Sequence, residues 1–223
     1  MTMADNAQSL IVPIGHYVGA SVPPGASEAE FHAVRIGWEI YKLEDAGQFA
    51  VWALGHGLPE PGGGDTAPWT RSALIGAARA SGIPNIGDAL ADLTARDLLI
   101  EVTPGTADAV EFARVCRTRS LLIGLGNTLE EPRLYAIGAS ENVPAVRVSG
   151  FAYELWKWGH ACDSLWQACH VFAAAGDPND PDETDPERVL TRCLAAIQVL
   201  VAGGAMYLDE AREDALEDPP LSG

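Results

Sequence analysis

Four side chains that could bind a metal ion lie close together in the second half of the sequence: His160, Cys162, Cys169 and His170. Thiolates and imidazoles at short spacing are the ligands of structural zinc sites. The apolar pattern places them on one helix, however, where Cys162 and Cys169 share a face and the two histidines point elsewhere. Because one helix cannot complete a tetrahedron in this way, we predict core thiols, surface imidazoles and no metal site.

Two loops resemble ligand-binding motifs only in part. The segment 176–185 is rich in Asp, Asn and Glu, but it lacks the central glycine and the terminal glutamate of an EF-hand calcium loop. The segment Gly124-Leu125-Gly126-Asn127 lacks the additional glycine and the Lys-Ser/Thr pair of phosphate-binding loops. We therefore predict a solvated acidic linker and a turn.

A catalytic nucleophile is not indicated by the sequence. It contains no Gly-x-Ser-x-Gly elbow, and no spacing of its Ser, Cys and His residues singles out a nucleophile with its base. We therefore expect a non-enzymatic protein that needs no cofactor. An enzyme whose catalytic groups converge from distant parts of the chain is the weaker alternative.

Two groups of residues are candidates for contact with a partner. Arg114, Arg117 and Arg119 form the densest basic segment of the chain, and such a patch can contact a phosphate, a DNA backbone or an acidic peptide. The favoured interpretation is that these arginines pair with surplus carboxylates across an internal interface. Trp156 and Trp158 alternate at the end of an expected β-ribbon, so one of them faces outward, as aromatic residues of binding surfaces do.

Composition limits the class of partner and the compartment. The formal net charge of −17 repels phosphate backbones at long range, which argues against a non-specific nucleic-acid binder. No apolar stretch reaches the roughly 18 residues of a membrane helix, and no basic segment followed by an apolar core indicates a secretory signal. The four cysteines have no disulfide-framework spacing. We expect a cytoplasmic protein with a composition typical of a GC-rich bacterial genome.

The elements that position these residues come from a sequence that repeats. Val34–Leu43 is echoed by Val146–Leu155 at a constant offset of 112 (146 − 34), with four of ten positions identical. The segment 10–15 before the first copy resembles 134–138 before the second. Farther along, 89–101 resembles 196–209. We infer two copies of one unit.

Hydrophobic periodicity predicts the same order of elements in each copy: a two-stranded β-ribbon, three helices and a short strand. In the first copy we expect strands at 10–20, 31–43 and 98–102, a first helix that begins at 44–45 and ends near 55–57, and further helices at 68–81 and 86–96. Between the copies we expect a helix at 108–116 and a strand at 121–125. In the second copy we expect a ribbon at 144–155, a first helix at 156–174, and merged second and third helices at 187–202. This is the order of a winged-helix unit.

The predicted fold is therefore α+β, with two winged-helix-like units from an internal duplication. The first unit spans 8–105 and the second 133–210, with a connector at 106–132 and an acidic tail at 211–223. Halves of this size are long enough to bury a core.

The order of elements, with a helix beginning after a Tyr-x-Leu motif, resembles the PqqD-like modules, small winged-helix proteins that recognise precursor peptides in ribosomal natural-product pathways. The matching segments are Tyr41-Lys42-Leu43-Glu44 and Tyr153-Glu154-Leu155-Trp156. The family's Asn or Asp after the leucine is replaced by Glu44 and Trp156. The resemblance implies that a peptide adds as a strand to the ribbon along Val34–Ile40 and packs against Leu90–Asp97 of the third helix.

We therefore expect an adaptor that recognises a peptide or protein partner, with a possible homodimer. The expected contact residues are Val34, Ile36, Trp38, Ile40, Leu90, Asp97, Trp156 and Trp158. The alternative is a winged-helix regulator whose third helix enters the major groove of DNA. That helix offers only Arg96 in the first copy, and Arg188 and Arg192 in the second, which is little positive charge for reading a groove.

Overall fold

The structure, a computed structural model, describes residues 8–59, 67–141 and 143–212. About 42 % of the chain is helical and 27 % is in strands, and the strands form several small antiparallel sheets. The α+β class is therefore confirmed. The predicted acidic tail lies almost entirely outside the described residues.

The first half contains a three-stranded meander, three helices and a two-stranded sheet. Its elements are β1 (Leu10–Pro13), β2 (His16–Ser21), β3 (Phe31–Ile36), β4 (Glu39–Leu43), α1 (Ala46–Gly55), α2 (Arg71–Ala80), α3 (Ile86–Ala95) and β5 (Leu99–Val102). The meander has the order β2-β3-β4, and β1 pairs antiparallel with β5. The strand predicted at 10–20 is thus two strands, and the one predicted at 31–43 is a hairpin that turns at Gly37.

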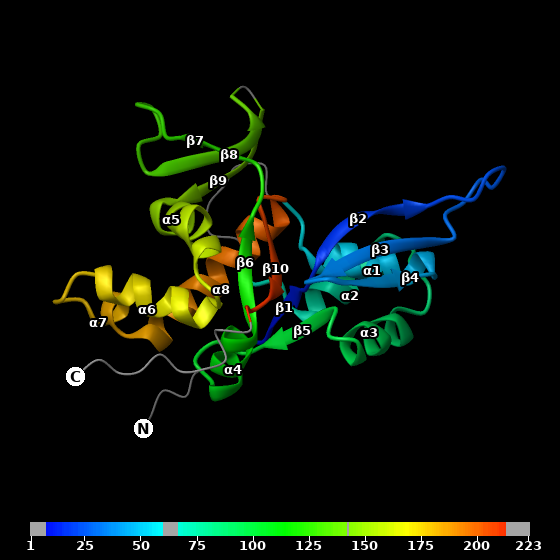
Figure 1. Cartoon of the computed structure of the whole chain (residues 1–223), viewed down its shortest axis with the longest axis horizontal. Helices are drawn as coiled ribbons and strands as arrows, with labels where there is room; N and C mark the ends of the chain where they lie inside the picture. The colour runs from blue at the N-terminus through cyan, green and yellow to red at the C-terminus, as the bar shows by residue number, and fades with distance from the viewer. Residues whose placement is uncertain (1–7, 60–66, 142, 213–223) are drawn as a thin grey trace.

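The second half follows the same order after the linking helix α4 (Ala107–Val115). Its elements are β6 (Cys116–Ser120), β7 (Ile123–Gly126), β8 (Leu134–Ser140), β9 (Val143–Ser149), α5 (Gly150–Trp158), the short 3-10 helix η1 (Gly159–Ala161), α6 (Leu165–Ala175), α7 (Pro181–Thr184), α8 (Pro186–Ala202) and β10 (Met206–Glu210). Here the meander is β7-β8-β9, and β6 pairs antiparallel with β10. The region 106–132, expected to be a connector, holds two strands that pair with the second half. Figure 1 shows the two small two-stranded sheets between the two meanders.

The predicted elements of the second half are wrong in two places. The ribbon expected to reach residue 155 ends at Ser149, because the Ser149 hydroxyl accepts from the Ala152 N–H and caps α5. The long helix expected at 156–174 is divided into α5, η1 and α6, and α6 has its own cap in Ser164. The helix expected at 187–202 is present as α8, Pro186–Ala202, and it follows α6 and the short helix α7.

The predicted offset of 112 between the copies is also wrong. It matches Val34 of β3 with Val146 of β9, which occupy different strands of their meanders. By strand pairing, Val34 corresponds to Ile137, because Val34 pairs with Tyr17 and Ile137 with Gly124 at the same place in the two meanders. Both Val34 and Ile137 are completely buried.

The first helix of each half is anchored by a buried tryptophan. The Trp52 indole N–H donates to the carbonyl of Ile14, just after β1, at 3.3 Å. The Trp156 indole N–H donates to the carbonyl of Leu121, just after β6, at 2.9 Å, and lies 3.0 Å from the carbonyl of Ala205. Each hydrogen bond fixes the meander's helix to the neighbouring two-stranded sheet.

The two halves share one hydrophobic core and are joined by polar contacts at β10. The buried carboxylate of Asp209 accepts from the Gly37 N–H in the β3–β4 turn at 2.7 Å. The Arg35 guanidinium donates to the Tyr207 hydroxyl at 3.0 Å, and the Gly15 N–H donates to the carbonyl of Leu208 at 2.8 Å. The halves are therefore one packed body.

Candidate functional site

The first meander has two edge strands, β2 and β4, and β4 is the one that leads into α1 and contacts the end of α3 through Arg96. Because β3 pairs with β2 on one side and β4 on the other, no peptide can add along Val34–Ile36, as the resemblance had implied. Val34 and Ile36 are core residues. The position of an added strand is therefore corrected to the outer edge of Glu39–Leu43.

The edge of β4 presents outward-facing backbone groups at alternate residues. In an antiparallel pair, alternate residues direct their N–H and C=O groups toward the partner strand. The two-residue turn that joins Ile36 to Glu39 directs Ile40 and Lys42 outward. The Lys42 carbonyl accordingly accepts from the Arg96 guanidinium at 2.9 Å. Ile40 retains an outward N–H and C=O for an added strand.

The side chains beside this edge are apolar at one end and acidic at the other. Trp38 at the turn is 96 % exposed and Ile40 is 50 % exposed. At the other end, an open cleft of about 310 Å³ lies between the start of α1 and α3, lined by Asp45, Gln48, Pro84, Asn85, Asp88, Ala89 and Asp92. Of the predicted α3 residues, Leu90 is buried and Asp97 is exposed after the end of the helix.

The matching strand of the second meander, β9, is covered by the end of α8 at Val146. At Gly203, the residue that follows α8, a Cβ atom would lie 2.6 Å from the Val146 Cβ, so the helix end packs directly on the strand. Arg96 holds this position in the first half. Pro144 removes an N–H from β9, and the β8–β9 register is irregular on both sides of Gly138.

The two tryptophans predicted to alternate on a ribbon lie instead on helix α5. Trp156 is buried and forms the anchor described above. Trp158 is 54 % exposed and contributes to the wall of a second site. Trp158 does face outward, as predicted for one of the pair, but both residues lie on a helix and not on a ribbon.

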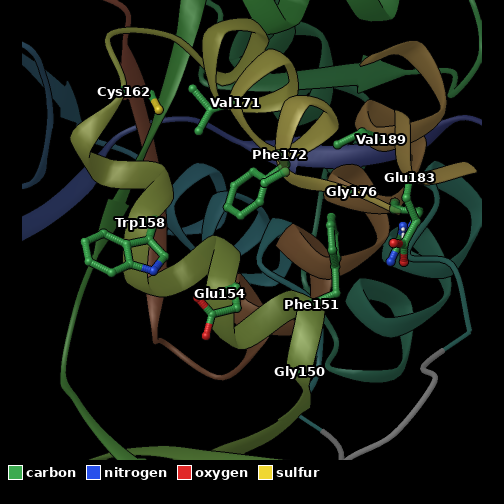
Figure 2. Close-up of a pocket in the computed structure, with 12 residues that line it drawn as sticks. Gly150, Phe151, Glu154, Trp158, Cys162, Val171, Phe172, Gly176, Glu183 and Val189 are labelled. Atoms are coloured by element: carbon green, nitrogen blue, oxygen red, sulfur yellow. Dashed lines mark hydrogen bonds and ion pairs between the residues drawn. The ribbon is translucent and has the colours of Figure 1, made fainter. Parts of the chain in front are cut away.

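That second site is a cavity of about 530 Å³ in the second half. One wall is α5, with Phe151, Glu154 and Trp158, and the opposite wall is α6, with Val171 and Phe172 (Figure 2). The remaining lining residues are Gly150, Cys162, Ala175, Gly176, Glu183, Val189 and Arg192. The volume lies in the range of small-molecule pockets, roughly 300–1,000 Å³.

The three arginines of the predicted basic patch are half-buried and do not form one exposed surface. Arg114 lies on α4, with its Nε 3.8 Å from Glu111 of the same helix. Arg117 and Arg119 lie on β6, opposite Asp209 and Tyr207 of β10. Burial, and then the neighbouring Arg119, lowers the pKa of Arg117. Among the described residues, the Arg117 Nε and Nη1 have no hydrogen-bond partner.

The cysteines and histidines considered as metal ligands lie apart on α6, η1 and the turn between them, with His160 and His170 exposed. Cys169 pairs with Cys193 at 4.0 Å between the sulfurs, and Cys116, Cys162, Cys169 and Cys193 are all free thiols. Burial raises the pKa of Cys162, which keeps it protonated and unreactive. In the described part of the chain, no group of three or more His, Cys, Asp or Glu residues is placed to hold a metal ion.

Comparisons with known proteins identify no relative, since no family model, curated protein or solved structure matches the chain. Within residues 8–59, 67–141 and 143–212, no helix combines the length and apolarity needed to cross a membrane.

Sequence reasoning missed a second short match between the halves, at the end of α1 and of α5. Trp52-Ala53-Leu54-Gly55-His56 is matched by Trp156-Lys157-Trp158-Gly159-His160, at an offset of 104 (156 − 52). Both segments end the first helix of their half. When the halves are aligned on this match, the helix cap Asp45 is equivalent to the helix cap Ser149. In the same alignment Leu54 is equivalent to Trp158, which lines the cavity.

Proposed function

We propose that this protein is a binding module that adds an extended segment of a protein partner to the free edge of β4. The observation that carries the proposal is the outward edge at Ile40, beside the exposed Trp38 and next to α3. Backbone hydrogen bonds along such an edge supply affinity, and alternate side chains supply specificity. The proposal keeps the recognition mode implied by the PqqD-like resemblance and moves it by one strand.

We also infer that the chain is a tandem of winged-helix-like units, with the second unit beginning at β6. The supporting observations are the matching strand pairings of the two halves, the matching helix caps and the paired tryptophan anchors. Only the first unit has an accessible meander edge beside its third helix. The second unit then serves as a support whose own edge is closed.

The charge of the surroundings favours a basic partner segment. The cleft at the end of β4 is lined by Asp45, Asp88 and Asp92, and the whole chain carries a net charge of −17. Opposite charge at this position raises the association rate and sets the direction in which the segment lies. A DNA backbone would be repelled by the same carboxylates, so the regulator alternative gains no support from α3.

The test is selection from a random peptide library, followed by binding measurements with one edge-blocking variant. Ile40→Pro removes the outward N–H without removing a hydrogen bond of the β3–β4 ladder. We expect basic, extended peptides to be selected, and their affinity to fall about tenfold or more in Ile40→Pro, which corresponds to about 1.4 kcal/mol.

The control is Val143→Thr, an exposed position on the closed strand β9, which should leave the affinity unchanged. Circular dichroism confirms that both variants fold. Peptides that bind Ile40→Pro as tightly as the unmodified protein would overturn the proposal. Enrichment of a defined DNA sequence in a parallel selection would favour the regulator alternative instead.

A further inference from the structure

The cavity between α5 and α6 is separate from the β4 edge and has a wall of mixed chemistry. Phe151, Glu154 and Trp158 are spaced by three and four residues, so they form one face of α5. Figure 2 shows Glu154 between Trp158 and Phe151, with Phe172 of α6 across the cavity. A carboxylate thus stands among three aromatic rings.

The corresponding face of the first half has none of these groups. When the helix caps Asp45 and Ser149 are aligned, Phe151, Glu154 and Trp158 correspond to Gly47, Ala50 and Leu54. In the first half α1 packs directly on α2, whereas α5 and α6 stand apart, with η1 between them in the chain. The two halves therefore differ in both shape and chemistry at this one place.

The rings that line the cavity are already in contact with cations of the protein itself. The Arg192 guanidinium lies 4.2 Å from the centroid of the Phe151 ring, and the Lys157 ammonium lies 5.0 Å from that of Trp158. Aromatic faces attract cations through the ring quadrupole. These contacts indicate that the local field favours positive charge at the rings.

The two carboxylates of the lining are not equally available. Glu183 is held at the far end by the Asp177 N–H at 3.2 Å and by Arg192 at 3.5 Å. Glu154 has one ion pair, with Lys157 at 3.4 Å, and both side chains are close to half-exposed. An exposed pair of this kind contributes little stability and is readily exchanged for a ligand cation.

We propose that this cavity binds a small organic cation, an ammonium group attached to an aromatic or alkyl body. The ammonium pairs with Glu154 between the rings of Trp158 and Phe151, and the body packs against Phe172 and Val171. The lining carries two carboxylates and one guanidinium, and the guanidinium of Arg192 already pairs with Glu183, so an anionic ligand would face the carboxylate of Glu154. A neutral hydrocarbon would bury Glu154 without a partner, which carries a desolvation cost.

The test compares three probes of one size and different charge: 4-phenylbutylammonium, 4-phenylbutan-1-ol and 4-phenylbutanoate. Calorimetry gives their affinities, and heteronuclear NMR shifts of α5 and α6 locate the bound probe. We expect the ammonium to bind about tenfold more tightly than the alcohol, with the carboxylate weakest. Glu154→Gln should remove the advantage of the ammonium and leave the binding of the alcohol unchanged.

The matched control is Glu187→Gln, an exposed carboxylate on α8 outside the lining, which should change neither affinity. Trp158→Ala should weaken the ammonium and the alcohol together, and thermal unfolding confirms that each variant folds. Equal binding of ammonium and alcohol, shifts that map away from α5 and α6, or no binding of any probe at millimolar concentration would overturn the proposal. Because Ile40→Pro leaves the cavity intact, failure here is distinguishable from failure of the β4 proposal.

Discussion

The two halves of the molecule have the same strand pairings, but they differ in the surfaces that they leave accessible. In the first half the strand edge β4 is accessible beside α3, and α1 packs tightly on α2. In the second half the end of α8 packs on β9 at Val146, and a cavity lies between α5 and α6. The two halves, although similar in strand pairing, thus present different surfaces, and a few residues at helix ends accompany this difference.

One position illustrates how small the change is. Arg96 follows α3 and reaches across a gap to the Lys42 carbonyl, whereas Gly203 follows α8 and leaves no gap at all. In the first half a long side chain links the helix end to the strand by a hydrogen bond, and in the second half a residue without a side chain lets the helix end contact the strand directly. The residue after the third helix of each half, Arg96 or Gly203, therefore differs together with the contact that the helix end makes with strand β4 or β9.

The largest expected effect tests whether the two anchors are equivalent. Trp156→Ala removes a buried ring with hydrogen bonds to two carbonyls, and we expect it to lower the free energy of unfolding by about 3–5 kcal/mol. Trp52→Ala should have a comparable effect, because its ring is buried and hydrogen-bonded at the matching place. Urea unfolding followed by circular dichroism measures both.

The control is Trp158→Ala, a half-exposed ring on the same helix, which should cost below about 1 kcal/mol. A single transition that shifts in both anchor variants agrees with the shared core. Two transitions, each sensitive to one variant only, would show that the halves unfold separately.

An intermediate effect tests the closed edge. Gly203→Ala places a methyl group against the Val146 Cβ, and we expect a loss of about 1–3 kcal/mol in the free energy of unfolding from overpacking. Gly76→Ala, on an exposed face of α2 with open space around it, should instead stabilise by about 0.5–1 kcal/mol. A neutral Gly203→Ala would mean that β9 and α8 separate easily, and the contrast with β4 would be lost.

The smallest effect concerns the histidine that ends each repeated segment. Burial lowers the pKa of His56 below its ordinary value of 6.5, whereas His160 is exposed. Below about pH 6.5 the unfolded chain binds a proton that the folded protein refuses, so stability falls as pH decreases in this range. His56→Gln should flatten this dependence between about pH 5 and pH 7, measured by urea unfolding.

The matched variant, His160→Gln, provides the control for the loss of a histidine. Burial also lowers the pKa of His16, which stacks on Tyr207 at the junction of the halves. A residual dependence on pH in His56→Gln is therefore assigned to His16. An unchanged slope in His56→Gln would contradict the prediction.

The sequence predicted local elements better than their boundaries and partners. Periodicity located α3 and β5 because Leu90, Leu93 and Leu99 have clear spacing and burial. It missed the division at residues 159–164, although Gly159 after α5 and the N-cap Ser164 before α6 are signals of a helix end and a helix start. It also chose the wrong echo, since Val34–Leu43 and Val146–Leu155 match in letters but differ in strand position. Tertiary pairing, and not local preference, decides such correspondences.

The candidate site followed the same rule. Exposure of Trp38 and Ile40 could be expected from an alternating ribbon, and both are exposed. The burial of Val34 depends on β2 lying on its other side, which no local pattern reports. The cavity between α5 and α6 was beyond reach for the same reason, because its walls come from helices that the sequence joined into one.

The hydrogen bond between Gly37 and Asp209 has a consequence for the order in which the chain is made. The two residues are 172 positions apart in the sequence. The nearby Gly15 N–H likewise donates to the carbonyl of Leu208, in the same late strand β10. During synthesis, the turn that carries Trp38 and leads into β4 therefore lacks its last partners until β10 has left the ribosome. The β3–β4 turn and the strand that follows it are thus completed by a segment from the far end of the sequence.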